Sequence, residues 1–166
     1  MKTIQEAYLE ACKNINIKEN ERIILESKNQ EYCYYFAKNI LGANIKEFEE
    51  AILESKSYHY CYVFARDVPR ANIKTHEKVV LKNKDADYCY YFAKDVKGAD
   101  IKALEEVVMK SKDYYCCYLF ARDIKESNKE ELFKVVLESG DKDCIYEFLE
   151  HVNFDKEKFI NYLLFI

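Results

Sequence analysis

The chain has 166 residues and a formal charge of −4, which suits a single domain and disfavours generic nucleic-acid binding, for which a basic domain is usual. Hydrophobic residues make up 49% of the chain, enough for a core, so wholesale disorder is excluded. With only 3 Gly and 1 Pro, the composition disfavours a sandwich or barrel of many short strands and leaves no room for a Gly-rich phosphate loop.

One pattern recurs every 28 residues through most of the chain. The repeats are 17–44, 45–72, 73–100, 101–128 and 129–153. Residues 1–16 match the second half of a repeat, and residues 154–166 match the first half of another. A fixed period in this range is typical of a solenoid. The sequence therefore predicts one domain over 1–166, an all-α, right-handed α-solenoid of about five helical hairpins with a half-repeat cap at each end.

Each repeat is predicted to hold two short helices. In repeat 73–100 the apolar residues Cys89, Phe92, Ala93 and Val96 follow helical spacing rather than strand alternation. Candidate N-caps of the first helices are Asn16, Asn44, Asn72, Asp100 and Asn128, and capping-box glutamates follow at Glu19, Glu47 and Glu131. Candidate N-caps of the second helices are Asn29, Ser57, Asp85, Asp113 and Asp141. Glycines at Gly42 and Gly98 are expected to end second helices.

The repeat pattern resembles the broad α-solenoid class that includes tetratricopeptide and HEAT proteins, over essentially the whole chain. Its period is shorter than the tetratricopeptide period of about 34 residues, and that family's Trp-Leu-Gly-Tyr signature is missing. Short motifs of the type Tyr-Cys-Tyr-x-Phe-Ala-Lys/Arg-Asp also resemble repeats of poorly characterised bacterial and phage proteins. The resemblance implies stacked helical hairpins and implies no activity.

The cysteines are predicted to pack in the core rather than to bind metal. One per repeat shares a helix face with phenylalanines: Cys33, Cys61, Cys89 and Cys117. Equivalent residues of stacked hairpins lie about 10 Å apart, whereas a zinc site needs every sulfur about 2.3 Å from the metal. Of the neighbours Cys116 and Cys117, one is expected in the core and one on its flank. No cofactor, metal site or catalytic set of nucleophile and base is predicted, and we expect no enzyme.

A repeated pair of a tyrosine and a cation forms the candidate binding face. The pairs, four residues apart, are Tyr34 and Lys38, Tyr62 and Arg66, Tyr90 and Lys94, and Tyr118 and Arg122. This spacing places each cation beside its tyrosine on a helix. In one interpretation the rings form the rim of the core and the cations extend to solvent. In the other the pairs bind a partner, together with the further outward Tyr35 and Tyr91. The following Asp67, Asp95 and Asp123 weaken the second interpretation by neutralising local charge.

Two further sets of polar residues receive structural interpretations. Glutamates on the apolar side of the first helices are Glu21, Glu49, Glu77 and Glu105. Buried carboxylates need partners, and the candidates are tyrosine hydroxyls or the lysines Lys28, Lys56, Lys84 and Lys112. A structural pair is favoured because Phe133 and Gly140 replace both members in the last repeat. The histidines His59, His76 and His151 show no metal-ligand spacing and are expected at the surface.

Together these patterns favour a non-enzymatic scaffold that binds a protein or peptide, such as an inhibitor or adaptor on a larger complex. The alternative is a single strand of nucleic acid, or a nucleotide, stacked on the same tyrosines, which the net charge disfavours. The predicted last helix is apolar, so a homo-oligomer that forms through Phe159, Leu163 and Phe165 is a further alternative. Seven cysteines, the lack of a secretory signal and the lack of a membrane-spanning stretch predict a cytoplasmic protein.

Overall fold

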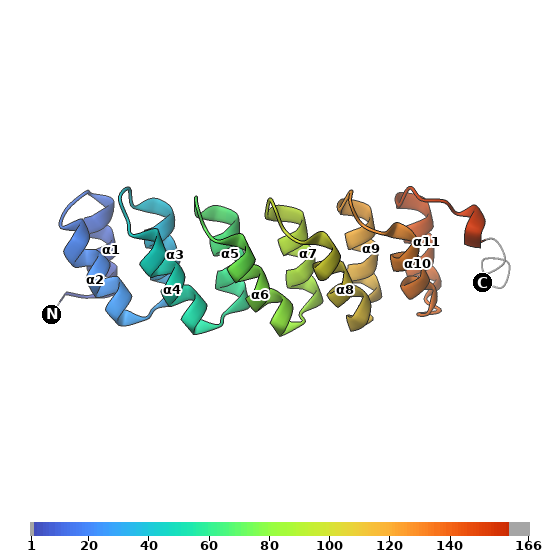
Figure 1. The fold of residues 1–166 in the computed structure, drawn as a ribbon, viewed down its shortest axis with the longest axis horizontal. Coiled ribbons are helices and arrows are strands. Elements are labelled where there is room, and N and C mark those ends of the chain that lie inside the picture. Colours follow the sequence, from blue (N-terminus) through green and yellow to red (C-terminus); the bar gives the residue numbers. More distant parts are fainter. Residues whose placement is uncertain (1, 160–166) are drawn as a thin grey trace. The chain divides into compact units, whose positions relative to one another are not determined.

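The computed structural model describes residues 2–159, which form eleven α-helices, one 3-10 turn and no strand (Figure 1). The all-α prediction is confirmed. The described residues belong to two compact units, Met1–Asn83 and Lys84–Ile166, and the boundary falls between the two helices of repeat 73–100. Helices begin at Ile17, Ile45, Ile73, Ile101 and Lys129, which reproduces the 28-residue spacing of the sequence.

The N-terminal unit is a two-layered set of six helices. They are α1 (Ile4–Cys12), α2 (Ile17–Ser27), α3 (Gln30–Asn39), α4 (Ile45–Ser55), α5 (Tyr58–Asp67) and α6 (Ile73–Asn83). Helices α1, α3 and α5 pack side by side, and α2, α4 and α6 do the same. The most extensive packing joins α1 to α2, α3 to α4 and α5 to α6. The second helix of each repeat therefore packs most closely on the first helix of the next repeat.

The C-terminal unit continues the same alternation. Its elements are α7 (Ala86–Asp95), α8 (Ile101–Ser111), α9 (Tyr114–Asp123), α10 (Lys129–Leu137), α11 (Lys142–His151) and the 3-10 turn η1 (Glu157–Phe159). Helix α9 packs against α7, α10 and α11. Of the capping helix predicted over 154–166, residues 154–159 are described, and they form no α-helix but the 3-10 turn η1, in which Phe159 is buried. Leu163 and Phe165 lie outside the described residues.

Side-chain capping begins every second helix of a repeat as predicted. Asn29, Ser57, Asp85, Asp113 and Asp141 each accept a hydrogen bond from a backbone N–H of the first helical turn. The prediction is wrong for two first helices. Asn16 has a left-handed backbone, with φ 46°, and makes no side-chain cap. The Asn44 side chain instead donates to Glu47 at 2.5 Å. The described capping box joins Thr3 and Glu6, which the sequence analysis did not identify.

The repeated lysines have a backbone role, which corrects their predicted pairing with glutamate. Lys28, Lys56, Lys84 and Lys112 all have left-handed backbones, with φ between 53° and 60°. Gly140 takes the same position in the last repeat with φ 67°. A left-handed residue after a helix lets its N–H bond a carbonyl of the last turn. Glycine replaces lysine there because it adopts this conformation without a steric cost.

Three of the four repeated glutamates accept hydrogen bonds from backbone N–H groups of the following repeat, whereas Glu77 lies 3.1 Å from the Lys74 ammonium. The carboxylates of Glu21, Glu49 and Glu105 accept hydrogen bonds, respectively, from Asn44, Asn72 and Asn128 at 3.3, 2.5 and 2.6 Å. Each donor N–H stands just before a helix, where no intrahelical carbonyl can satisfy it. These three glutamates therefore tie α2, α4 and α8 to the start of the next first helix.

The core contains one polar residue that the sequence analysis placed at the surface. Its largest fully buried side chains include Phe36, Phe48, Phe64, Phe92, Phe120, Phe133 and Phe148, and the cysteines Cys33, Cys61, Cys89 and Cys117 are buried as predicted. His76 is 0% exposed, so the surface prediction is wrong for this histidine. Its ring packs on Phe64 and its Nε2 lies 3.1 Å from the Glu49 carboxylate. Its position corresponds to Phe48 and Leu104 of neighbouring repeats, which explains the burial.

Cys116 is buried as well as Cys117, against the prediction that one of the two lies on the flank. The Cys116 thiol lies 3.2 Å from the Asp87 carboxylate, which accepts its hydrogen bond. The neighbouring helix α7 therefore covers a position that a single-helix projection leaves at the edge.

Candidate functional site

The four tyrosine–cation pairs lie on the second helices of their repeats. Each cation lies 5.0–5.3 Å from the ring centroid of its tyrosine. The pairs are Tyr34 and Lys38 in α3, Tyr62 and Arg66 in α5, Tyr90 and Lys94 in α7, and Tyr118 and Arg122 in α9. All four rings are buried, while the cations reach solvent. The rings therefore close the edge of the helical core.

In the N-terminal unit, Asp67 joins two of these pairs. The Tyr34 hydroxyl donates to its carboxylate, and the Lys38 ammonium lies 2.8 Å from the same oxygen. Arg66 approaches the two oxygens through Nε and Nη2 at 2.6 and 2.9 Å. Arg66 also donates to the Tyr62 hydroxyl at 3.0 Å. One carboxylate thus links α3 to α5 through two tyrosines and two cations.

The C-terminal unit holds a second copy of this network around Asp123. Tyr90 and Lys94 of α7 lie 2.5 and 2.7 Å from its Oδ2 atom. Arg122 contacts its two oxygens at 2.6 and 3.0 Å and the Tyr118 hydroxyl at 3.4 Å. The arrangement of residues and atoms is that of the N-terminal unit, two repeats earlier in the chain.

Each network holds two cations and one carboxylate, so its side chains carry a formal charge of +1. Hydrogen bonds from Arg66 and Arg122, together with those from the lysines and tyrosines, hold the pKa values of Asp67 and Asp123 well below their usual range. Hydrogen bonds to the same carboxylates raise the pKa values of Lys38 and Lys94. Among the predicted binding residues, Tyr35 and Tyr91 differ, since 40% and 44% of their surfaces are exposed.

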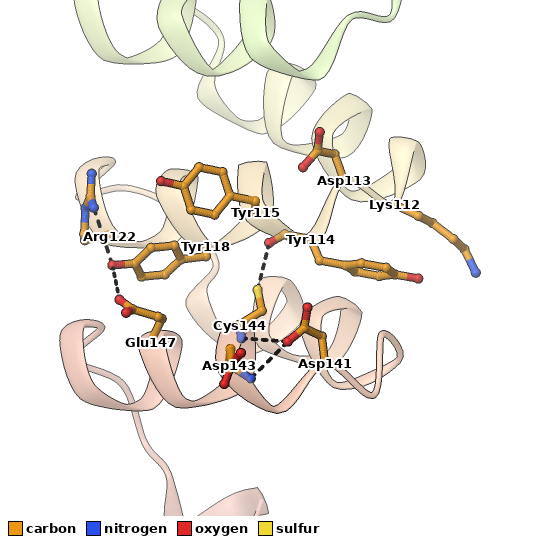
Figure 2. Close-up of a pocket in the computed structure, with 10 residues that line it drawn as sticks. All are labelled: Lys112, Asp113, Tyr114, Tyr115, Tyr118, Arg122, Asp141, Asp143, Cys144 and Glu147. Carbon is orange, nitrogen blue, oxygen red and sulfur yellow. Dashed lines mark hydrogen bonds between the residues drawn. The ribbon is translucent and has the colours of Figure 1, made fainter.

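A groove of about 650 Å³ lies between α9 and α11 in the C-terminal unit (Figure 2). Its lining is Lys112, Asp113, Tyr114, Tyr115, Tyr118, Arg122, Asp141, Asp143, Cys144 and Glu147. Tyr115 and Tyr118 project from α9 toward the same end of the groove, and Glu147 of α11 faces Tyr118 (Figure 2). Tyr115 is the most exposed of these rings, at 63%. Aromatic surface and carboxylates therefore share one concave site.

The groove lies beside a position at which the last two repeats differ from the first three. Cys144 occupies the position of Tyr32, Tyr60 and Tyr88, and Cys116 occupies the same position in the preceding repeat. A thiol is much smaller than a phenol ring, so space opens between α9 and α11. The Cys144 thiol donates to the Tyr114 carbonyl oxygen at 3.7 Å and leaves the surface of Tyr115 uncovered.

The tyrosine–carboxylate contact changes at the same place. His151 stands where earlier repeats carry the aspartate, as at Asp67 and Asp123. The Tyr118 hydroxyl instead lies 3.4 Å from Glu147, on the adjacent turn of α11. His151 lies 3.4 Å from the same carboxylate. These contacts are longer than those made by Asp67 and Asp123, so Glu147 is the more accessible carboxylate.

The groove carries an excess of negative charge. Four carboxylates and two cations line it, and the carboxylates of Asp123 and Glu138 lie 2.6 and 3.4 Å, respectively, from Arg122 and Lys112. Of the lining residues, only Tyr118 and Arg122 were predicted from the sequence as binding residues. Tyr115, Asp143 and Glu147 were missed, although the change from aspartate to His151 marks the place.

A second groove, of about 420 Å³, lies between α4 and α6 of the N-terminal unit. It is lined by Leu53, Lys56, Lys78, Val79, Lys82 and Asn83. The three lysines are exposed, and none of them forms an ion pair among the residues described. This groove is therefore basic and partly apolar, the opposite of the groove between α9 and α11.

Metal-binding and thiol chemistry find little support in the geometry. Within residues 2–159, His, Cys, Asp and Glu form no group of three that could hold a metal ion. Burial raises the pKa of Cys33 to about 11, and those of Cys61, Cys89 and Cys117 to about 12, so these thiols stay protonated near neutral pH. None of the described helices has the length and apolar character needed to cross a membrane.

No model of a known protein family matches this chain, and no match is found among curated proteins or solved structures.

Proposed function

We propose that this chain is a non-enzymatic binding scaffold of the α-solenoid class, which holds a peptide segment of a partner protein in the groove between α9 and α11. The observation that carries the proposal is the groove itself, a concave site of about 650 Å³ that combines exposed tyrosine with carboxylates. Tyrosine supplies large contact area at low entropic cost, which favours peptide recognition. The site lies at the last repeat, in which His151 replaces the aspartate found at Asp67, Asp95 and Asp123.

The tyrosine–cation pairs play a different part in this proposal. Their cations form ion pairs with Asp67 and Asp123 inside each unit. They stabilise the stack of helices, and the groove presents the binding surface.

The substitution C144Y tests the proposal because it introduces the tyrosine that the first three repeats carry at this position and fills the groove without changing the charge. Random peptides displayed on phage would be selected on the full chain and counted again on C144Y. We expect a set of peptides enriched on the native chain and at least tenfold less retained by C144Y. Equal retention on both proteins, with C144Y folded by circular dichroism, contradicts the proposal.

A second candidate function, binding of a nucleotide or single-stranded nucleic acid, is favoured by one observation. Lys56, Lys78 and Lys82 gather beside Leu53 and Val79 in the groove between α4 and α6. Lysines attract phosphates, and the attraction weakens with salt. Because the chain lacks Trp, a raised 260/280 nm ratio that survives a high-salt wash would support this function. Loss of that absorbance in a K78E/K82E variant would place the ligand in this groove.

A further inference from the structure

We infer that the groove between α9 and α11 recognises an arginine side chain in a basic segment of the partner. This inference rests on the proposed function and specifies the chemistry of its ligand. It draws on the charge of the C-terminal unit, on an arrangement that the chain uses twice internally, and on the residues that the groove leaves accessible.

Charge complementarity favours a cationic ligand. The C-terminal unit holds 18 acidic and 13 basic residues, a formal charge of −5, whereas the N-terminal unit holds 12 acidic and 13 basic residues, a charge of +1. Complementary potentials increase the rate of encounter and set specificity. The negative groove therefore lies in the half of the chain that attracts cations.

The chain itself shows how it binds a guanidinium group. Arg122 lies 5.3 Å from the ring centroid of Tyr118, and its Nε and Nη2 atoms contact the two oxygens of Asp123. Arg66 makes the equivalent contacts in the N-terminal unit. A planar guanidinium can stack on an aromatic face while it binds a carboxylate through two N–H groups, and an ammonium cannot.

The groove presents the tyrosine and carboxylate members of this arrangement to solvent. Tyr115 has Leu119, not a cation, four residues later on α9. Asp143 makes no side-chain hydrogen bond or ion pair with any residue in the described part of the chain, and Glu147 makes only contacts of 3.4 Å. Asp113 and Asp141, in contrast, cap their helices. We therefore assign Tyr115, Asp143 and Glu147 as the residues that hold the arginine.

Fluorescence polarisation with a labelled peptide of alternating serine and arginine tests this assignment on the full chain. The same peptide with citrulline keeps the shape of the side chain and removes its charge, and a lysine peptide keeps only the charge. We expect at least tenfold weaker binding of the citrulline peptide and severalfold weaker binding of the lysine peptide. The variant C144Y should also bind the arginine peptide at least tenfold more weakly. Because C144Y keeps the net charge, general attraction between an acidic protein and a basic peptide would not respond to it.

The outcomes separate the two proposals. Equal binding of arginine and citrulline peptides, or arginine binding that C144Y leaves unchanged, overturns the inference of an arginine site. If peptides from the phage selection still depend on position 144 but lack arginine, the inference fails and the proposed function stands. If no selected peptide depends on position 144 either, both fail. The double variant D143N/E147Q should weaken the arginine peptide at least tenfold while peptides bound elsewhere are unaffected.

Discussion

The ammonium of Lys94 in α7 lies 2.7 Å from the carboxylate of Asp123 in α9, which joins two adjacent second helices of the C-terminal unit. Lys38 and Asp67 form the same contact in the N-terminal unit at 2.8 Å. The aspartates are mostly buried, whereas the lysines are partly exposed. These aspartates were interpreted from sequence only as neutralising charges, yet each of them organises a network between helices.

The substitution D123N is expected to destabilise the protein. It removes the negative charge that Lys94, Arg122 and Tyr90 share. A hydrogen bond to a charged group is worth about 1.5–3 kcal/mol, and partial exposure of the cations reduces this value. We expect a loss of about 1–2 kcal/mol in the free energy of unfolding, measured with urea at pH 7. D143N, at an exposed carboxylate of the same unit, is the control and should change stability by less than about 0.5 kcal/mol.

The penalty of D123N should depend on pH. The pKa of Asp123 is depressed in the folded protein, so its contribution is present above the ordinary aspartate pKa of about 3.9 and is lost as the pH falls below that value. Urea unfolding at a series of pH values should therefore show the two proteins converging below about pH 4. A constant difference down to pH 2 would contradict a charge-based contribution.

The contact between Glu105 and the Asn128 N–H predicts a large loss of stability for one substitution of Glu105 and a small loss for another. E105A removes the acceptor of this partly buried hydrogen bond and should cost about 1–3 kcal/mol in unfolding free energy. E105Q keeps an acceptor oxygen. Because burial raises the pKa of Glu105, the charged form is the costly one, and E105Q should cost less than about 0.5 kcal/mol. Equal losses in the two variants by chemical denaturation would show that the negative charge, rather than the hydrogen bond, matters.

The sequence predicts the helices well because their signals are local. Apolar spacing places the helices of repeat 73–100, and the caps Asn29 and Asp113 depend only on residues within one turn. The buried cysteines follow from the same spacing. Such features need no knowledge of how neighbouring helices pack.

The groove and the buried histidine could not be predicted in the same way. The groove lies beside Cys144, which is small where the first three repeats carry tyrosine, and the size of a gap depends on the facing helix. Histidine is a polar residue type, so its identity alone does not predict that His76 is buried. Its alignment with Phe48 in the repeat would have predicted the burial. The left-handed backbone of Lys28 is likewise hidden, because only Gly140 signals that conformation.

The left-handed lysines predict that exchanging lysine for glycine stabilises the protein and that the reverse exchange destabilises it. A left-handed conformation costs a non-glycine residue about 1–2 kcal/mol. Glycine avoids this cost, but its greater conformational freedom in the unfolded chain offsets part of the gain in stability. K28G should therefore stabilise the chain by about 1 kcal/mol, since Lys28 has φ 53°. G140K should destabilise it by a similar amount, because Gly140 has φ 67°. Thermal unfolding followed by circular dichroism would measure both, and K28A should show no gain.

His76 makes the folded protein sensitive to mild acid. Its Nε2 faces Glu49, whose carboxylate also accepts a hydrogen bond from Asn72, while its Nδ1 has no hydrogen-bond partner within the described structure. Burial is the main cause that lowers the pKa of His76, and the nearby Glu49 opposes it only in part. The folded state therefore favours the neutral ring, whereas the unfolded chain binds a proton near pH 6.5.

Stability should consequently decrease as the pH falls below about 6.5, because the unfolded state then binds more protons than the folded state. Between pH 7.5 and 5.5 we expect a loss of about 1 kcal/mol in unfolding free energy. H76L, which introduces the residue found at the equivalent Leu104, should abolish this loss. H59L removes an exposed histidine and should leave it unchanged. Urea unfolding of the three proteins at the two pH values measures the effect, and an identical loss in H76L would exclude His76 as its source.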